Sequence, residues 1–306
     1  MKKNLTHFLP YSVLLLYFFL FTGLVQAQIT VTPNATASAL IDRLAGSGIT
    51  YLNPQLTCPN NASGKFDNGM ASSVLIDSGI VLTTGLAKSS GSNFGVNGLA
   101  SDFASVNNNT NGGDNDLATA ASTAASNLYD LCKLEFDFVP TGDTIQFRYR
   151  FGSEEYPEYN CTNFNDIFAF FISGPGYPTP TNVALVPGTN IPVSINSINN
   201  GTIVTANGGA LSTCNSMGAG SPFTAYYVNT SSSTTITYDG LTTLLTAKAA
   251  VTPCSTYHMK FAIADKSDHI YDSGVFLEAG SFSSDIASVT NVTSSNSLAS
   301  ANPFAM

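Results

Sequence analysis

The sequence predicts an all-β fold, a β-sandwich of the jelly-roll-like type with one or two short helices. From about residue 49 onward, apolar and polar residues alternate in short runs, and Gly, Pro, Asn and Asp separate these runs. Only two segments have the composition of a helix. With 43% hydrophobic and 11% aromatic residues, the chain can build a sizeable core.

The first predicted helix covers residues 36–44. Its apolar residues Leu40, Ile41 and Leu44 fall on one helical face, Thr36 can cap the start, and Gly46 follows the end. Alanine-rich residues 117–128 predict a second short helix, which follows a polar loop at residues 107–116.

The predicted strands are short runs bounded by turn residues. They cover residues 73–77, 79–83, 131–139, 144–151, 166–173 and 257–264.

A hairpin is predicted between residues 134–138 and 145–151. Apolar residues alternate in both runs, and Pro140–Asp143 between them has turn composition. Antiparallel pairing with both apolar sets on one face aligns opposite charges on the other face. The expected pairs are Glu135 with Arg150 and Asp137 with Arg148.

A second hairpin is predicted at Asp239-Gly240, which separates residues 234–238 from residues 241–251. Asp-Gly favours the tight type I′ turn that joins adjacent antiparallel strands.

The first 27 residues have the three parts of a secretory signal peptide. Lys2 and Lys3 precede an apolar run over residues 11–25, and Val25-Gln26-Ala27 predicts cleavage before Gln28. The alternative is an uncleaved membrane anchor, for which this run is short. We expect a secreted or cell-surface protein with one domain over residues 28–282, followed by a Ser/Asn-rich linker or disordered tail at 283–306.

The charge balance excludes one class of partner. The net charge is −9, and only 10% of the residues are charged, so the chain has too few Lys and Arg residues for a nucleic-acid-binding face. An acidic, lysine-poor surface instead suits an extracellular protein that holds divalent cations.

Five cysteines remain after the leader: Cys58, Cys132, Cys161, Cys214 and Cys254. None forms a CxxC pair, so two disulfides and one leftover thiol are expected in an exported protein. Spacing alone does not choose the pairs. The polar, loop-like surroundings of Cys161 and Cys214 favour joining these two, and Cys58 with Cys132 is the next choice.

Carboxylates gather in three segments and suggest a Ca²⁺ site. Ca²⁺ binds roughly six to eight oxygen ligands from carboxylates, amides and carbonyls, and loops at strand ends can converge. The alternative is solvated turn carboxylates, and the spacing matches no EF-hand. The candidate metal ligands are Asp114, Asp116, Glu154, Glu155, Asp166, Asp265, Asp268 and Asp272.

Sequence motifs give no positive indication of catalysis. After the leader only His258 and His269 remain, and there is no HExxH, GxSxG or phosphate-loop motif. A carboxylate pair for glycoside hydrolysis is the remaining enzymatic hypothesis, but the consecutive Glu154 and Glu155 would face opposite sides of a strand.

An ordered series of blocks resembles the choice-of-anchor L domain family over roughly residues 35–282. The blocks are GIVLTTG (79–85), GDNDL (113–117), LEFDFVP (134–140), FRYRFGSEEY (147–156), NDIFAFFISGPG (165–176), NVALVPG (182–188), YDG (238–240), YHMKFAIAD (257–265) and DSGVFLEAGSF (272–282). The resemblance implies an exported surface protein of bacteria that use type IX secretion, with a role in adhesion or surface recognition. It brings no catalytic residues. Members usually continue into repeat modules and a C-terminal sorting or anchoring segment, and residues 283–306 resemble neither.

The leading functional hypothesis is a non-catalytic binding or adhesion module that recognises a glycan or surface polymer, with Ca²⁺-stabilised loops. Tyr156 and Tyr159 are the candidate stacking residues for sugar rings. The alternatives are a structural spacer or matrix module without a specific ligand and a carboxylate-dependent glycoside hydrolase.

Overall fold

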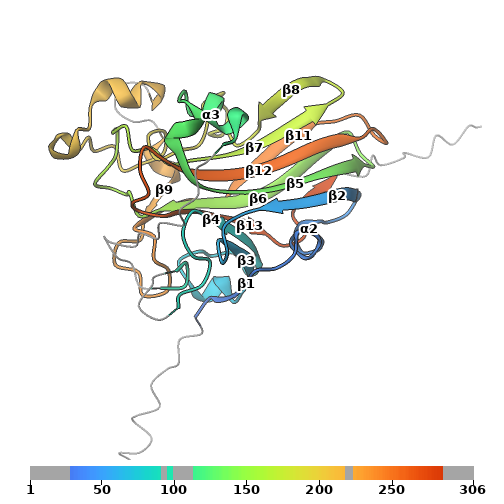
Figure 1. The fold of residues 1–306 in the computed structure, drawn as a ribbon, viewed down its shortest axis with the longest axis horizontal. Helices are drawn as coiled ribbons and strands as arrows, with labels where there is room; N and C mark the ends of the chain where they lie inside the picture. The colour runs from blue at the N-terminus through green and yellow to red at the C-terminus, as the bar shows by residue number, and fades with distance from the viewer. Residues whose placement is uncertain (1–27, 91–94, 99–112, 218–222, 285–306) are drawn as a thin grey trace, which may run out of the picture.

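Two antiparallel sheets pack face to face, so the fold is the predicted all-β sandwich (Figure 1). The computed structural model describes residues 28–90, 95–98, 113–217 and 223–284. The expected signal peptide, the tail from residue 285 onward and most of the 107–116 loop lie outside these residues.

The larger sheet has nine strands, most of them short. Its main path is β1 (Thr30–Pro33), β3 (Ser63–Asp67), β4 (Gly79–Thr83), β13 (Ser273–Glu278), β6 (Thr144–Ser153), β10 (Gly240–Thr242) and β9 (Tyr227–Asn229). β11 (Leu245–Ala250) and β14 (Ser283–Ser284) also pair with β6, so the fold extends two residues beyond the predicted domain end.

The smaller sheet has five strands in the order β2 (Ile49–Thr57), β5 (Leu128–Pro140), β12 (Tyr257–Lys266), β7 (Ile167–Gly174) and β8 (Tyr177–Asn182). Both of its edge strands are irregular. The β2–β5 register shifts between Leu52 and Gln55, around Pro54, and Pro178 and Pro180 lie in β8.

Two α-helices accompany the sheets: α2 (Ala37–Leu44) buries its apolar face in the core between them, and α3 (Asn115–Ala120) packs against β7. Helix α2 confirms the first predicted helix, and the Thr36 hydroxyl accepts a hydrogen bond from the Ala39 N–H at 3.2 Å. Helix α3 is shorter than the predicted second helix, because β5 already begins at Leu128. Single 3₁₀ turns occur at Gly69–Ala71, Ala125–Asn127, Thr205–Asn207 and Thr224–Tyr226, with a longer 3₁₀ segment at Leu211–Met217.

The core between the sheets is rich in aromatic rings. The fully buried ring of Phe282 lies 5.4 Å from Phe136, 5.1 Å from Phe138 and 5.8 Å from Phe147, measured between ring centroids. The backbone of Phe282 also accepts a hydrogen bond from the Gly46 N–H. The residues that follow β13 therefore complete the core.

The predicted hairpin between residues 134–138 and 145–151 is wrong, although both runs are strands. β5 pairs with β2 and β12, whereas β6 belongs to the other sheet. The chain thus crosses from one sheet to the other at residues 141–143. Alternation of apolar residues does not distinguish two strands that pair within one sheet from two strands that lie in opposing sheets. The apolar side chains point into the core in both cases.

The predicted charge pairs are accordingly absent. The observed partners are Lys133 and His258 for Glu135, His258 for Asp137, Glu278 for Arg148, and the Ser73 and Val74 carbonyls for Arg150.

The prediction of a hairpin at Asp239-Gly240 is also wrong. Gly240 lies within β10 and pairs with Ser153 and Asn229. A Cβ at this position would lie 2.6 Å from the Tyr156 ring, so the glycine permits close packing and does not form a turn.

Residues 73–77 form turns instead of the predicted strand. Val74 and Ile76 are nevertheless buried, in a small second core beneath the nine-stranded sheet, and Leu75 between them is exposed. Alternating burial in this segment therefore comes from a loop that packs on a sheet.

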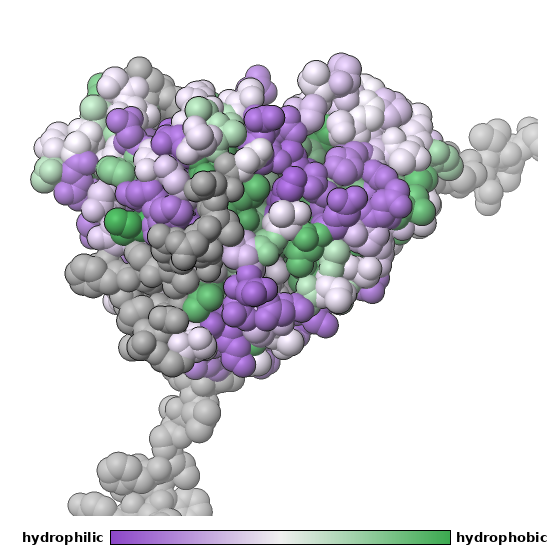
Figure 2. All heavy atoms as spheres, viewed as in Figure 1, coloured by the Kyte–Doolittle hydropathy of each residue, from purple (hydrophilic) through white to green (hydrophobic). Residues whose placement is uncertain are grey.

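The surface shows no large apolar area in the view of Figure 2, where hydrophobic residues form small patches between hydrophilic ones. Within the described part of the chain, no helix is long and apolar enough to cross a membrane.

Candidate functional site

Asp114 and Asp116 form an ion-paired cluster on the outer face of the five-stranded sheet. Asp114 caps α3, and its two carboxylate oxygens lie 2.8 and 2.9 Å from Lys260 Nζ. Asp116 Oδ2 lies 2.5 Å from the same nitrogen. Burial alone would raise the pKa of Asp114, but hydrogen bonding and charge from Lys260 lower it below its usual value. Lys260 therefore already pairs with both carboxylates, and Lys133 Nζ lies 3.6 Å from Asp114 Oδ2.

The other six predicted metal ligands gather at one end of the sandwich, where β4, β6 and β12 end and β7 and β13 begin. Glu154 and Glu155 follow β6, Asp166 precedes β7, and Asp265 lies near the end of β12. Asp268 and Asp272 lie in the loop between β12 and β13. We call Glu154, Glu155, Asp166, Asp265, Asp268 and Asp272 the end cluster.

Most of the end cluster is removed from solvent. Glu154, Glu155 and Asp166 are each 1% exposed, Asp265 is 0% exposed and Asp272 is 4% exposed. Such burial is unusual for carboxylates and normally requires a compensating charge or hydrogen bond. These residues are therefore not the solvated turn carboxylates considered as an alternative.

Asp166 connects the two sheets. One carboxylate oxygen accepts a hydrogen bond from the backbone N–H of Lys266 in β12 at 3.1 Å, and the other accepts one from the Ser273 hydroxyl in β13 at 2.7 Å. Glu154 also faces the interior, where the Thr237 hydroxyl donates to its Oε1 at 2.5 Å.

The burial makes ionisation of the end cluster unfavourable. It raises the pKa of Asp166 to about 7. It also raises the pKa values of Glu155 and Asp265 well above their usual range, and the charge of Asp166 adds to the effect on both. Lys266 is a neighbouring cation, but burial lowers its own pKa. Groups with such perturbed ionisation concentrate at functional sites.

Several oxygens of the end cluster have no hydrogen bond of normal geometry among the described residues. They are Oε2 of Glu155 and both carboxylate oxygens of Asp265. Asp166 and Thr84 are the polar neighbours of Asp265. Buried acceptors without donors are costly, so these oxygens require a counter-ion or a proton.

A pocket of about 250 Å³ opens beside the end cluster. Its lining combines aromatic rings with carboxylate and amide groups. The lining residues are Glu155, Tyr159, Phe164, Asn207, Asp268, Ile270 and Tyr271. The Tyr159 ring centroid lies 5.1 Å from that of Tyr271 and 5.7 Å from that of Phe164. Glu155 belongs both to the pocket and to the end cluster.

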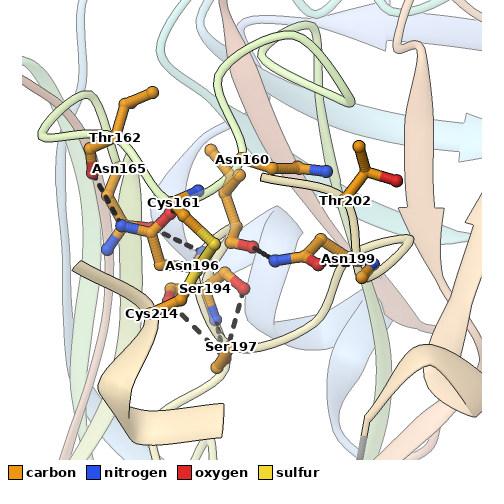
Figure 3. The surroundings of a disulfide bond; sticks show 12 residues. Asn160, Cys161, Thr162, Asn165, Ser194, Asn196, Ser197, Asn199, Thr202 and Cys214 are labelled. Atoms are coloured by element: carbon orange, nitrogen blue, oxygen red, sulfur yellow. Dashed lines mark hydrogen bonds between the residues drawn. A yellow bond between two sulfur atoms is a disulfide. The ribbon is translucent and has the colours of Figure 1, made fainter. Parts of the chain in front are cut away.

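The loop that carries Glu155 and Tyr159 is held in place by a disulfide between Cys161 and Cys214 (Figure 3). Asn196 binds this loop twice: its Oδ1 accepts from the Cys161 N–H at 2.7 Å, and its Nδ2 donates to the Thr162 carbonyl at 2.8 Å. The pocket wall is thus fixed by covalent and hydrogen-bonded links before any ligand binds.

Tyr156 does not have the predicted ligand-binding position. Its side chain is fully buried, and its hydroxyl donates to the Ile198 carbonyl at 2.6 Å. Because its ring packs against Gly240 and Tyr227, Tyr156 is a core residue. Tyr159, by contrast, lines the pocket.

The second disulfide joins Cys58 to Cys132, and Cys254 is an exposed free cysteine. These are the two pairs that the sequence favoured.

Sequence reasoning missed Phe164 and Tyr271 as pocket residues. Both stand beside polar residues of the acidic segments, next to Asn165 and Asp272. Their position beside polar residues in these loops was the sequence signal that could have identified them as pocket residues.

Two larger hollows lie elsewhere on the surface. One of about 410 Å³ lies over β6 and β11 and includes Arg148 and Lys248, and one of about 610 Å³ lies beside β8 and α3. Neither is lined by a fully buried carboxylate, so the smaller pocket beside the end cluster is the stronger candidate site.

Among the described residues, no group of three or more His, Cys, Asp or Glu side chains converges in an arrangement that could by itself hold a metal ion. Two carboxylates supplemented by backbone carbonyl, hydroxyl and water oxygens remain compatible with Ca²⁺.

A comparison with family models matches residues 28–283 to the choice-of-anchor L domain. No curated protein and no solved structure matches the chain.

Proposed function

The chain belongs to the choice-of-anchor L domain family, which indicates a surface-associated protein, and we propose that it is a non-catalytic module that binds a carbohydrate surface polymer. The observation that carries this proposal is the pocket that combines three aromatic rings with carboxylate and amide groups on a disulfide-held loop.

The chemistry of the pocket suits a sugar. Aromatic rings such as Tyr159 and Tyr271 can pack against the apolar face of a pyranose, and carboxylates accept hydrogen bonds from its hydroxyl groups. Asp268 supplies such an acceptor, and Asn207 supplies an amide. A preformed wall lowers the entropy lost on binding.

The position of Glu154 supports a non-catalytic role. Glycoside hydrolysis uses two carboxyl groups that flank the scissile bond. Glu154 faces the interior, where it accepts from Thr237, and only Glu155 of the consecutive pair lines the pocket. This pair therefore lacks the geometry that the hydrolase hypothesis requires.

The test is a glycan-array and titration experiment with residues 28–306. We expect Tyr159→Ala to weaken binding of the selected glycan at least about fivefold, because stacking of one ring contributes about 1–3 kcal/mol at a comparable contact. Tyr159→Phe should retain most of the affinity. Tyr177→Ala is the matched control, since Tyr177 lies in β8 at the opposite end of the sandwich.

A folded protein that binds no glycan would refute the proposal and favour the structural spacer. Equal binding by Tyr159→Ala and Tyr177→Ala would place the glycan elsewhere.

A further inference from the structure

The end cluster contains more buried acid than its surroundings neutralise. Electrostatic interactions connect Asp166 with Glu155, Asp265 and Asp268, and Asp265 with Asp272. Within the described chain, Lys266 interacts with Glu155 and Asp166, and His269, which binds Asp130 at 3.0 Å, also interacts with Asp268.

We propose that the end cluster binds a single Ca²⁺ ion between Asp166 and Asp265, close to Glu155. Both carboxylate oxygens of Asp265 and Oε2 of Glu155, in side chains 0% and 1% exposed, have no hydrogen bond of normal geometry among the described residues, which indicates a missing positive partner. The site does not depend on which polymer the pocket binds.

Oxygen ligands favour a hard cation, and an irregular set of ligands favours Ca²⁺ over Mg²⁺, which requires near-octahedral geometry. The side chains around Asp166 and Asp265 offer carboxylate and hydroxyl oxygens, including Ser273 and Thr84. The neighbouring cysteines 161 and 214 are joined in a disulfide, so no thiolate is available from them. Ca²⁺ accepts an irregular shell of about six to eight oxygens, in which backbone carbonyls and water complement a few carboxylates. Zinc and copper prefer nitrogen and sulfur ligands.

The bound ion would join both sheets. Asp265 belongs to β12 of the five-stranded sheet, and Asp166 already contacts Ser273 of the nine-stranded sheet. The same ion would fix the two loops that form the pocket, because Glu155 and Asp268 belong to these loops. Glu155 and Asp268 are the two members of the end cluster that also line the pocket.

The experiment uses Tb³⁺ as a luminescent Ca²⁺ analogue with residues 28–306 purified in EDTA and then freed of the chelator. Residues 28–306 contain 11 of the 13 tyrosines of the chain and no tryptophan, so tyrosine excitation gives a clean sensitised signal. Thermal melts in EDTA and in millimolar Ca²⁺ form the second readout. The variants are Asp265→Asn and, as the matched control in the lysine-paired cluster, Asp116→Asn.

We expect the native protein to show saturable Tb³⁺ emission that Ca²⁺ displaces, and to melt several degrees higher in Ca²⁺. Asp116→Asn should behave in the same way. Asp265→Asn should bind Tb³⁺ at least about tenfold more weakly and lose the Ca²⁺-dependent shift. In EDTA it should melt no lower than the native protein, because the neutral amide replaces a buried acid that otherwise has to be protonated or paired with a cation. This melt also shows that the variant is folded.

Absence of both Tb³⁺ emission and a Ca²⁺-dependent shift in the native protein would overturn the proposal and leave protonation as the means of neutralisation. Equal responses of Asp265→Asn and Asp116→Asn would overturn the assignment of the ion to the end cluster. Neither readout requires a glycan, so failure of the carbohydrate proposal would leave this one testable.

Discussion

Phe282 should be one of the most important single side chains for the stability of this fold. Its ring is fully buried among Phe136, Phe138 and Phe147, with centroid distances between 5.1 and 5.8 Å. Because these rings come from both sheets, they cannot all move to fill the space that Phe282→Ala would leave. Core Phe→Ala substitutions cost about 3–5 kcal/mol.

A loss of this size is easily measured in a domain of this length. At about 2–4 °C per kcal/mol, we expect the melting temperature to fall by roughly 6–20 °C. Urea unfolding of residues 28–306 should give the free energy directly. Leu244→Ala is the control, because Leu244 is 38% exposed and should cost less than about 1 kcal/mol. A loss below about 1.5 kcal/mol for Phe282→Ala would contradict the view that this ring closes the core.

Two further predictions concern polar groups. His258→Gln should remove a pH-dependent part of the stability, because hydrogen bonding to Glu135 raises the pKa of His258 above 6.5. The stabilisation is fully present below the unfolded pKa and is lost as the pH rises through the folded pKa; since His258 is partly exposed, we expect less than about 1 kcal/mol. Urea midpoints of both proteins between pH 5.5 and 8.5 would test this, and a constant difference would contradict it. Tyr156→Phe should lower the free energy of unfolding by about 1–2 kcal/mol through loss of one buried hydrogen bond, while glycan titrations should show unchanged affinity; weakened binding would return Tyr156 to the ligand site.

Local features were predictable where one cause dominates. Thr36 and the spacing of Leu40, Ile41 and Leu44 specify α2, because capping and helical periodicity agree. β5 follows equally well from alternation, and β4, which is buried along its whole length, has the predicted bounds.

Pairing was not predictable in the same way. The crossing between β5 and β6 depends on which sheet each strand joins, and both choices bury the same residues. Likewise, Gly240 accommodates the Tyr156 ring, a contact between residues far apart in the sequence. A turn motif cannot reveal such a contact.

The candidate site was partly predictable. Two of the three acidic segments correctly marked loops that converge at the end of the sandwich, but composition could not show that Asp114 and Asp116 instead pair with Lys260. Nor could it separate the buried Tyr156 from Tyr159 in the pocket, since burial depends on the tertiary path of the loop.

The irregular edges of the five-stranded sheet have a consequence for crowding. An exposed edge strand can pair with the edge of a neighbouring molecule and seed an extended intermolecular sheet. Proline supplies no N–H for such pairing, and a register irregularity interrupts the row of acceptors. With Pro54 in β2 and Pro178 and Pro180 in β8, copies held at high density should resist strand-to-strand aggregation along this sheet. Closely spaced copies of the domain should therefore not pair with one another through β2 or β8.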